Sequence, residues 1–529
     1  MMRIASLSSL SAVFTSMVAA SASRLKVVTW NVAAINNNPF EYWVSYPNPA
    51  YNSLMANVER FIQNPGPDDV AVNKIFPWYD DLEQLMLASG LVSVADAAQV
   101  REIWNKDISQ RAIVTGFLKD GQLGKKRFAS MPDRITNTIV RPSGTLYRPT
   151  AINCYPGRFA SLEDWWAQWR QFMFSQHVRP GVTVVQLLKP IPRAKYPALS
   201  ETEERLSVGL QIVYQAVFDA IIIHMLSVVG TDGAGNDVWQ RIRSDIAQAL
   251  NRDKPSKVAG ILRAQYGDAD VVFLQEVANG FDAELARAGV LDAYEAVFPA
   301  SARARDQNSV ILLRKGVFVN AREASVAEFL PADAPLDDGD LLVVRAEDAT
   351  GRPFMLASFH GDTDGLATPA VVRAVHAAAA AAAAAQAGSG APAPVLLFGL
   401  DANAYETPAG KQLAVGEFKS LVAELGMTHC FERASAHLTT FNARTYLQPQ
   451  LNKAAGKAEL RSKGDVNPKD YVLGYAAQVA FVHDSVVRDN TGRGVYLEDT
   501  VFPSLEFPSD HGIVCVHVDV VQQGVKSEL

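Results

Sequence analysis

Six short segments of this chain share a pattern, and in most of them a run of β-forming residues ends in a carboxylate, carboxamide or imidazole. They are Val-Val-Thr-Trp-Asn (27–31), Val-Phe-Leu-Gln-Glu (272–276), Ser-Phe-His-Gly-Asp (358–362), Phe-Gly-Leu-Asp-Ala-Asn (398–403), Lys-Asp-Tyr-Val (469–472) and Pro-Ser-Asp-His (508–511). A buried strand delivers a polar side chain to the rim of a sheet in this way. The segments therefore predict one polar site built by residues far apart in the sequence.

The segments around these motifs predict an α/β fold. Short stretches rich in Val, Ile, Leu and Phe, mostly bounded by turn residues, indicate strands. They are Lys26–Trp30, Val271–Leu274, Ser309–Leu313, Leu341–Val344, Phe354–Phe359, Val395–Phe398, Val479–Val482 and Ile513–Val518. Helical spacing occurs at Phe281–Ala288, Thr368–Ala387 and Gln412–Leu425. Strands in two groups with helices between them fit a four-layer α/β/β/α sandwich.

Asn31 and Glu276 are candidate metal ligands. Each follows an apolar strand, and together they offer an amide oxygen and a carboxylate. Hard oxygen ligands of this kind suit Mg²⁺. Taken alone, Asn31 would be a strand-end turn residue and Glu276 a helix-start carboxylate. Their joint occurrence within the ordered set of six motifs favours metal ligation.

Asp401 and Asn403 are two positions apart at the end of a predicted strand. Residues i and i+2 of an extended strand face the same side, so both side chains can reach one phosphate or one attacking water. The alternative is an Asx turn that caps a helix.

Two histidines also stand at the ends of predicted elements. His511 follows Asp510 just before the last strand, and its imidazole can serve as a base or as a phosphate-stabilising acid. For that role it needs a carboxylate that fixes its tautomer. His360 ends the strand Phe354–Phe359. The alternatives are a solvated turn for the Asp-His pair and a satisfied core histidine for His360.

The order of the six motifs resembles the endonuclease/exonuclease/phosphatase superfamily of metal-dependent phosphoesterases. The resemblance covers residues 25–35 and roughly 265–520, and it also implies the four-layer sandwich. Thr439-Thr440-Phe441 and the residues before His511 look more like the deadenylase-type branch than the abasic-endonuclease branch.

The resemblance implies roles for the site residues. Asp401 would orient or deprotonate the attacking water, and Asn403 and His360 would each hold a phosphate oxygen. Asp470 would pair with His511. The resemblance leaves open whether His511 or Asp401 is the general base.

Asp510 would join Asn31 and Glu276 at the metal, which we expect to be Mg²⁺, with Mn²⁺ able to substitute. The chain departs from common family versions at Asp362 and Asp364, which add carboxylates beside His360. These two could bind a second cation or solvate a turn, and we leave them outside the catalytic set.

A large insertion separates the first motif from the second. Members of this family place one crossover helix there, so roughly two hundred residues are inserted in this chain. We expect the phosphoesterase domain to comprise residues 23–39 and 251–522, with a mainly helical insertion at 40–250. Helical spacing at Asp80–Ala88, Leu162–Ser175 and Glu203–Val229 supports this division. Trp165, Trp166 and Trp169 could stack bases, but core packing is expected for most of them.

The two ends of the chain predict targeting signals. Residues 1–22 combine an early arginine, an apolar stretch and an Ala-Ser-Ala site, as in a signal peptide. The tail 523–529 ends in Lys-Ser-Glu-Leu, which resembles a retrieval signal for a receptor. We therefore expect the endoplasmic reticulum lumen, with secretion as the alternative. Residues 216–229 are apolar but contain Asp219 and His224, which favours a buried helix over a membrane span.

The cysteines indicate little covalent cross-linking. Cys515 falls in a predicted core strand, and a Cys154–Cys430 bridge is left open.

Composition narrows the function without identifying a substrate. The net charge of −7 gives no global basic field, which lowers the expectation of tight, non-specific binding to long duplexes. We expect a metal-dependent hydrolase that cuts a phosphodiester, with nucleic acid as the favoured substrate. The first alternative is a phosphatase or phospholipase acting on inositol phosphates or sphingomyelin-type head groups. The second is a non-catalytic binding protein on the same fold.

Overall fold

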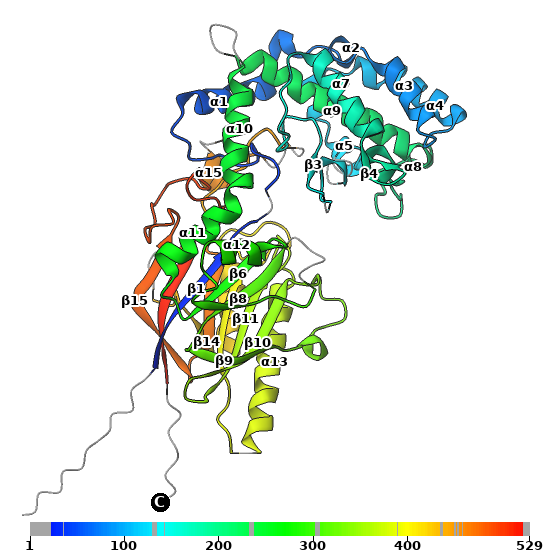
Figure 1. The fold of residues 1–529 in the computed structure, drawn as a ribbon. Helices are drawn as coiled ribbons and strands as arrows, with labels where there is room; N and C mark the ends of the chain where they lie inside the picture. Colours follow the sequence, from blue (N-terminus) through cyan, green and yellow to red (C-terminus); the bar gives the residue numbers. More distant parts are fainter. Residues whose placement is uncertain are drawn as a thin grey trace, which may run out of the picture.

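The computed structural model describes residues 23–521 except for residues 35, 130–134, 142, 232–236, 302–306, 389, 434–436, 449–450, 452–453 and 457–458. The predicted signal peptide (1–22) and the Lys-Ser-Glu-Leu tail lie outside the described residues. The fold is the predicted α/β sandwich, with a helical insertion after the first strand (Figure 1).

Two six-stranded sheets form the centre of the sandwich. The first has the order β15-β16-β1-β6-β8-β7 and the second the order β13-β14-β12-β11-β10-β9. The first comprises β1 (Ser23–Asn31), β6 (Val271–Val277), β7 (Tyr294–Val297), β8 (Asn308–Arg314), β15 (Val479–Asp489) and β16 (Ile513–Val520). The second comprises β9 (Phe318–Glu323), β10 (Leu341–Asp348), β11 (Pro353–His360), β12 (Val395–Asp401), β13 (Met427–His429) and β14 (Asp470–Tyr475).

The alternation of side chains along the strands builds two cores. In β6, Val271 and Phe273 pack between the sheets, whereas Val272 and Leu274 belong to the core on the outer face of the first sheet. Helices α11 (Lys254–Tyr266) and α12 (Phe281–Arg287) pack on that outer face. Helices α13 (Thr368–Ala387) and α14 (Val415–Glu424) pack on the second sheet. All eight predicted strands and all three predicted helices of the sandwich are present.

The sequence did not predict β7, β9, β13 or β14. Strand β9 has mostly exposed side chains, and β13 has only three residues, so neither shows an apolar run. Both lie at sheet edges, where one side of the strand stays unpaired.

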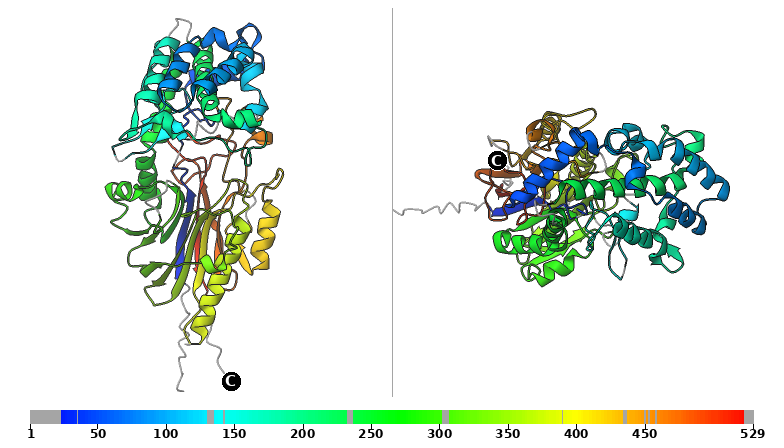
Figure 2. Two further views of the ribbon diagram at one scale, coloured as in Figure 1. Left: turned by 90° about the vertical axis from the view of Figure 1, so that its right-hand side faces the viewer. Right: turned by 90° about the horizontal axis from the view of Figure 1, so that it is seen from above.

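The insertion lies over the end of the sandwich at which β1 ends, and α10 leads from it down into α11 (Figures 1 and 2). Its helices are α1 (Pro49–Gln63), α2 (Val72–Ile75), α3 (Tyr79–Ala88), α4 (Val94–Lys106), α5 (Gly121–Lys126), α7 (Leu162–Ser175), α8 (Glu201–Arg205), α9 (Ser207–Val229) and α10 (Val238–Ala247). Two short hairpins join them, β2–β3 (Thr138–Ile139, Leu146–Tyr147) and β4–β5 (His177–Arg179, Val182–Thr183). One continuous core runs from the insertion onto the first sheet, so the insertion packs on the sandwich.

Helix α9 is the central helix of the insertion. By length and composition both α9 and α13 could cross a membrane, but 78% of the apolar window of α9 is buried inside the protein. Trp165, Trp166 and Trp169 on α7 are likewise buried, which confirms that they are core residues. They do not form a base-stacking surface.

The three cysteines are free and buried. Cys154 and Cys430 do not form the bridge that the sequence left open. Cys515 lies in β16, as predicted for a core thiol.

Candidate functional site

Three predicted site residues lie in one row across the second sheet. His360 on β11 is paired with Asp401 on β12, which is paired with Asp470 on β14. Each stands at the end of its strand, so the register places the three side chains at the same edge. Asp401 is 1% exposed and Asp470 is fully buried.

Asn31 and Glu276 come from neighbouring parallel strands of the first sheet. The Nδ2 group of Asn31 donates to Glu276 Oε1 at 3.0 Å and to Asp401 Oδ2 at 2.9 Å, which links the two sheets. Asn31 Oδ1 accepts from the N–H of Ala33 at 2.9 Å. In this arrangement the amide nitrogen of Asn31 faces the carboxylates, and metal ligation by Asn31 remains a prediction.

Left-handed backbone conformations occur at three residues of the site. Ala33 has φ 45°, Glu276 has φ 53° and Asn403 has φ 45°. Such conformations cost energy for residues other than glycine, and they cluster at functional sites. At Glu276 the register of β6 with β8 shifts between Leu274 and Val277, so a bulge directs the carboxylate toward the site.

Asn403 reaches the site by a turn. Strand β12 ends at Asp401, and the N–H of Asn403 donates to Asp401 Oδ1 at 2.8 Å. The predicted extended geometry is therefore wrong here, because an Asx-type turn brings Asn403 alongside Asp401. Both residues nevertheless line the same cavity.

His511 is held on both sides of its ring. Its Nδ1 lies 2.9 Å from Asp470 Oδ2, and its Nε2 lies 3.5 Å from Asp401 Oδ2. Its backbone is fixed as well, since Trp30 Nε1 donates to its carbonyl at 3.0 Å and its N–H donates to Ser509 Oγ at 3.1 Å. The predicted pairing of Asp470 with His511 agrees with this geometry.

The charges of the site shift its pKa values. Burial by itself would lower the pKa of His511, but the carboxylates of Asp470 and Asp401 outweigh it and hold that pKa well above the usual value. Burial would raise the pKa of Asp401, yet His511 and His360 keep it below the usual value. Burial would also raise the pKa of Glu276, and His360 and Asn31 keep it low. Burial raises the pKa of Asp470, although His511 opposes that change. These directions favour ionised Asp401 and Glu276 beside a protonated His511.

Lys469 is a site residue that the sequence reasoning did not use. Its Nζ donates to Asp465 Oδ2 at 2.7 Å, Asn403 Oδ1 at 3.1 Å and the Tyr405 hydroxyl at 3.3 Å. These three acceptors match the three protons of the ammonium. Lys469 therefore orients the amide of Asn403 so that its NH₂ group is left for a ligand. The sequence feature that could have identified Lys469 was its position beside Asp470 in the Lys-Asp-Tyr-Val segment.

Lys254 is a second residue that sequence reasoning missed. It is the first residue of α11, is 2% exposed, and donates from Nζ to the carbonyl of Ala33. Burial lowers the pKa of Lys254 to about 8, although the carboxylates of Asp510 and Glu276 oppose that change. No motif marks Lys254, because only the folded junction between β1 and α11 brings it to the site.

A polar cavity of about 640 Å³ connects these side chains. Of the predicted residues, Glu276, His360, Asp401, Asn403, Asp510 and His511 line it. Residues in or beside the two ends of the insertion also line it, namely Asn36, Glu41, Tyr42 and Lys254. Asn31 and Asp470 do not line the cavity but contact residues that do.

The additional carboxylate of Asp362 supports a turn. It accepts from the N–H groups of Asp364 at 3.0 Å, Leu366 at 3.1 Å and Ala367 at 2.9 Å, just before α13. These backbone hydrogen bonds account for the position of the Asp362 carboxylate without a bound cation, although Asp362 lines the cavity.

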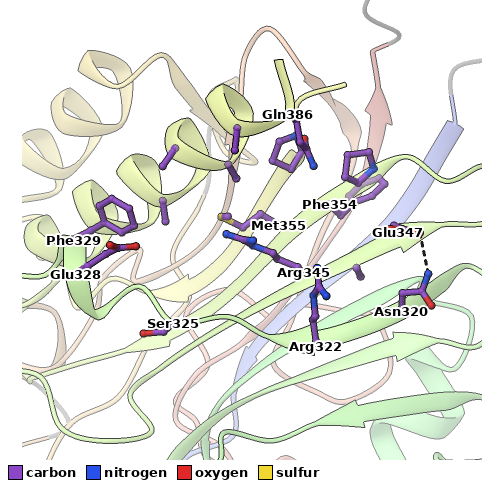
Figure 3. A pocket seen from close by; sticks show the side chains of 17 residues that line it. Asn320, Arg322, Ser325, Glu328, Phe329, Arg345, Glu347, Phe354, Met355 and Gln386 are labelled. Atoms are coloured by element: carbon purple, nitrogen blue, oxygen red, sulfur yellow. Dashed lines mark hydrogen bonds between the residues drawn. The ribbon is translucent and has the colours of Figure 1, made fainter. Parts of the chain in front are cut away.

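A second cavity, of about 510 Å³, lies between the second half of α13 and strands β9, β10 and β11 (Figure 3). Arg322 and Arg345 extend toward it from paired strands, below Met355 in the view of Figure 3. It contains none of the predicted site residues. The cavity at the strand ends is therefore the candidate site.

Two groups of side chains in the candidate site could hold a cation. The ligand atoms of Asp401, Asp470 and His511 lie within 4.8 Å of one another. The hydrogen bond between Asp470 and His511 Nδ1 already occupies part of that group. The other group is Glu276 with Asp510, whose carboxylates line the cavity. Oxygen ligands of this kind suit Mg²⁺ or Mn²⁺.

Comparison with known proteins gives two family matches. The model of the endonuclease/exonuclease/phosphatase family matches residues 241–511. A model described as a domain of unknown function (DUF8234) matches residues 69–244, within the insertion. No curated protein matches the chain.

Solved structures give distant matches to the sandwich. An endonuclease/exonuclease/phosphatase from Bacteroides vulgatus is 13% identical over 52% of this chain and 91% of its own, with a TM-score of 0.34. D. rerio TDP2 complexed with single-strand DNA product is 15% identical over 50% and 91%, with a TM-score of 0.31. The human Nocturnin catalytic domain is 15% identical over 50% and 86%, also with a TM-score of 0.31.

Proposed function

Because the chain belongs to the endonuclease/exonuclease/phosphatase family, we propose that this phosphoesterase hydrolyses a phosphodiester with a divalent cation, and that its substrate is nucleic acid. One observation carries the proposal. Asp401 Oδ2 lies among three nitrogen atoms, at 2.9 Å from Asn31 Nδ2, 3.5 Å from His511 Nε2 and 3.7 Å from His360 Nε2. A carboxylate surrounded by donors at a cavity wall suits a water and a phosphate bound side by side.

The residues fit a divalent cation through the carboxylates of Glu276 and Asp510. Asn31 holds Glu276 in place by the hydrogen bond of 3.0 Å. We propose Mg²⁺, with Mn²⁺ able to substitute. When bound, such an ion would neutralise the phosphate and stabilise the leaving oxygen.

The other side chains have distinct roles in the proposal. The low pKa of Asp401 keeps it ionised, so it can accept a proton from an attacking water. The raised pKa of His511 keeps it protonated, so it can donate to a phosphate oxygen. This assignment favours Asp401 over His511 as the base. Asn403, oriented by Lys469, and His360 would donate to the remaining phosphate oxygens.

The confined cavity favours a second candidate function. A volume of about 640 Å³ bounded by the insertion suits a single-stranded end, a nucleotide or an isolated head group better than a long duplex. An inositol phosphatase or a sphingomyelin-type phospholipase is therefore the alternative. The presence of all eight predicted polar residues argues against a binding protein without activity.

Metal titration and a substrate panel test the proposal. Purified protein should hydrolyse bis(p-nitrophenyl) phosphate with Mg²⁺ or Mn²⁺, and a chelator should abolish the reaction. Matched single- and double-stranded oligonucleotides, inositol phosphates and sphingomyelin should then be compared. Preference for single strands supports the nuclease, whereas hydrolysis of only the small phosphates or the lipid supports the alternative. Efficient cutting of closed circular duplex DNA would contradict restricted access.

We also propose that the protein resides in the endoplasmic reticulum lumen. The proposal depends on the predicted signal peptide and the Lys-Ser-Glu-Leu end. Deletion of the last four residues should release the protein into the medium. Equal retention of the two forms would contradict a retrieval signal.

A further inference from the structure

We propose that Lys254, at the start of α11 just after the insertion, is a substrate-binding residue whose ammonium contacts a phosphate oxygen. The inference depends on the proposed phosphoesterase function, because it places a further contact in the same cavity. It also assigns a role to the junction at which the chain returns from the insertion to the sandwich.

Hydrogen bonding leaves Lys254 with unused donors. Its Nζ donates to the carbonyl of Ala33, and among the residues that the structure describes this is its one hydrogen-bond acceptor. An ammonium has three protons, so two remain for a ligand. The side chain lines the cavity beside Glu276, His511 and Asp510.

The charge of Lys254 is also incompletely balanced. Among the described residues, its Nζ forms no ion pair with a carboxylate, although Asp510 and Glu276 act on it from a greater distance. A buried cation without a close counter-ion is costly. A bound phosphate would supply the missing negative charge at this wall of the cavity.

Lys469 provides a contrast within the same cavity. It is equally buried, but its ammonium has three acceptors, including the carboxylate of Asp465 at 2.7 Å. Lys469 has no donor left for a substrate and serves to position Asn403. Lys254 has the spare donors and charge that a phosphate contact requires.

The fold holds Lys254 in place from both ends of the insertion. Just before it, the amide of Asn251 donates to the Asn36 carbonyl at 3.1 Å and to Asn37 Oδ1 at 3.2 Å. The chain that leaves β1 is thereby tied to the chain that returns to α11. The Lys254 contact to Ala33 closes the same junction. The two chain segments that flank the insertion thus form one wall of the site.

The position of Lys254 predicts opposite effects of its charge on phosphate binding and on cation binding. Its positive charge attracts a phosphate, but it also repels a divalent cation held by Glu276 and Asp510. Removal of the charge should weaken phosphate binding while leaving cation binding unchanged or tighter. A purely structural lysine would weaken both.

The test compares Lys254→Met and Lys254→Arg with Lys257→Met as a matched control. Lys257 lies on the same helix and donates to the carbonyls of Leu505 at 2.7 Å and Ala249 at 3.2 Å, but it does not line the cavity. Three quantities should be measured: inhibition by inorganic phosphate, KM and kcat for bis(p-nitrophenyl) phosphate, and Mn²⁺ affinity by calorimetry without substrate. Thermal unfolding checks that each variant is folded.

Lys254→Met should weaken phosphate inhibition by about tenfold to a hundredfold, the range for a charge-assisted hydrogen bond. Mn²⁺ affinity should stay the same or rise. Lys254→Arg should retain most of the phosphate affinity, and Lys257→Met should match the wild type.

Two results would overturn the inference: phosphate affinity unchanged in Lys254→Met, or parallel loss of phosphate affinity, Mn²⁺ affinity and thermal stability. In either case, metal-dependent phosphoester hydrolysis by the wild-type protein would still support the proposed function. A wild-type protein that hydrolyses no phosphoester with Mg²⁺ or Mn²⁺ would instead refute the proposed function itself.

Discussion

The strand ends of the sandwich and the interior of the insertion both bury charged side chains, but they use them differently. At the strand ends, Asp401 and His511 are buried and still line a cavity of about 640 Å³. In the insertion, Asp219 and Arg148 are fully buried inside the helical core. Arg148 donates to Asp219 at 2.8 and 3.4 Å, and Trp169 Nε1 donates to Asp219 at 2.9 Å.

The difference shows that burial of charge does not by itself identify a functional site. Both oxygens of Asp219 are occupied by side chains of the core, so the pair can only hold the insertion together. Around Asp401, by contrast, the donors converge at a wall that a ligand can reach. We therefore expect substitutions at the strand ends to reduce activity, and substitutions in the interior of the insertion to reduce stability.

The largest expected effect is that of Glu276→Gln. Loss of the carboxylate should weaken the bound cation and lower kcat/KM by about a thousandfold, since a metal supplies several kcal/mol of charge stabilisation. Unfolding by urea should change little. The exposed Glu295→Gln on β7 is the control. Full activity of Glu276→Gln at limiting Mg²⁺ would refute the ligand assignment.

Asp219→Ala tests the other side of the comparison. Breaking a buried ion pair leaves Arg148 without its carboxylate and should cost about 3–5 kcal/mol of unfolding free energy. Activity per folded molecule should be unchanged. The exposed Glu102→Ala, which breaks an ion pair with Lys106 on the surface, should have little effect on either. A loss of kcat without a loss of stability in Asp219→Ala would contradict the purely structural role of Asp219.

His511→Ala should lower kcat by about a hundredfold or more, the range for loss of acid–base or phosphate stabilisation. Asp470→Asn should cause a smaller loss, because it only misorients the imidazole through the 2.9 Å contact. Steady-state kinetics of the single and double variants provide the measurement. If the decreases in kcat of the two single variants multiply in the double variant, the two residues do not act as a pair.

The smallest expected effect is on stability at low pH, and it arises from a second buried histidine of the sandwich. Burial lowers the pKa of His429 on β13 to about 4, and its Nδ1 accepts from the N–H of Phe431 at 3.2 Å. The folded state therefore keeps His429 neutral, while the unfolded chain protonates it near pH 6.5. The resulting stability is complete above about pH 6.5 and is lost as the pH falls toward 4.

Unfolding free energy should thus fall by about 1 kcal/mol between pH 7 and pH 5.5 through His429 alone. His429→Asn keeps an acceptor for Phe431 and should remove this component of the pH dependence. The control is His177→Asn, at an exposed position on β4. Identical pH dependence in His429→Asn and the wild type would contradict a neutral buried imidazole.

The sequence predicted the frame of the sandwich well because that information is local. Apolar runs such as 271–274, and polar residues directly after them, are properties of a few neighbouring residues. Strands β9 and β13 were missed because one is largely exposed and the other is short. The extended geometry favoured for Asn403 was wrong because the chain turns after β12, although Asn403 still lines the predicted cavity.

By itself, the sequence determined the fold class, the strand ends and the residue types that meet there, since these follow from patterns along the chain. Only the tertiary structure decided that Lys469 orients Asn403, that Lys254 reaches the cavity, and that Asn31 joins two carboxylates from different sheets. Each of these facts depends on contacts between segments separated by up to several hundred residues. Such contacts arise from the packing of the two sheets and the insertion, which no local pattern records.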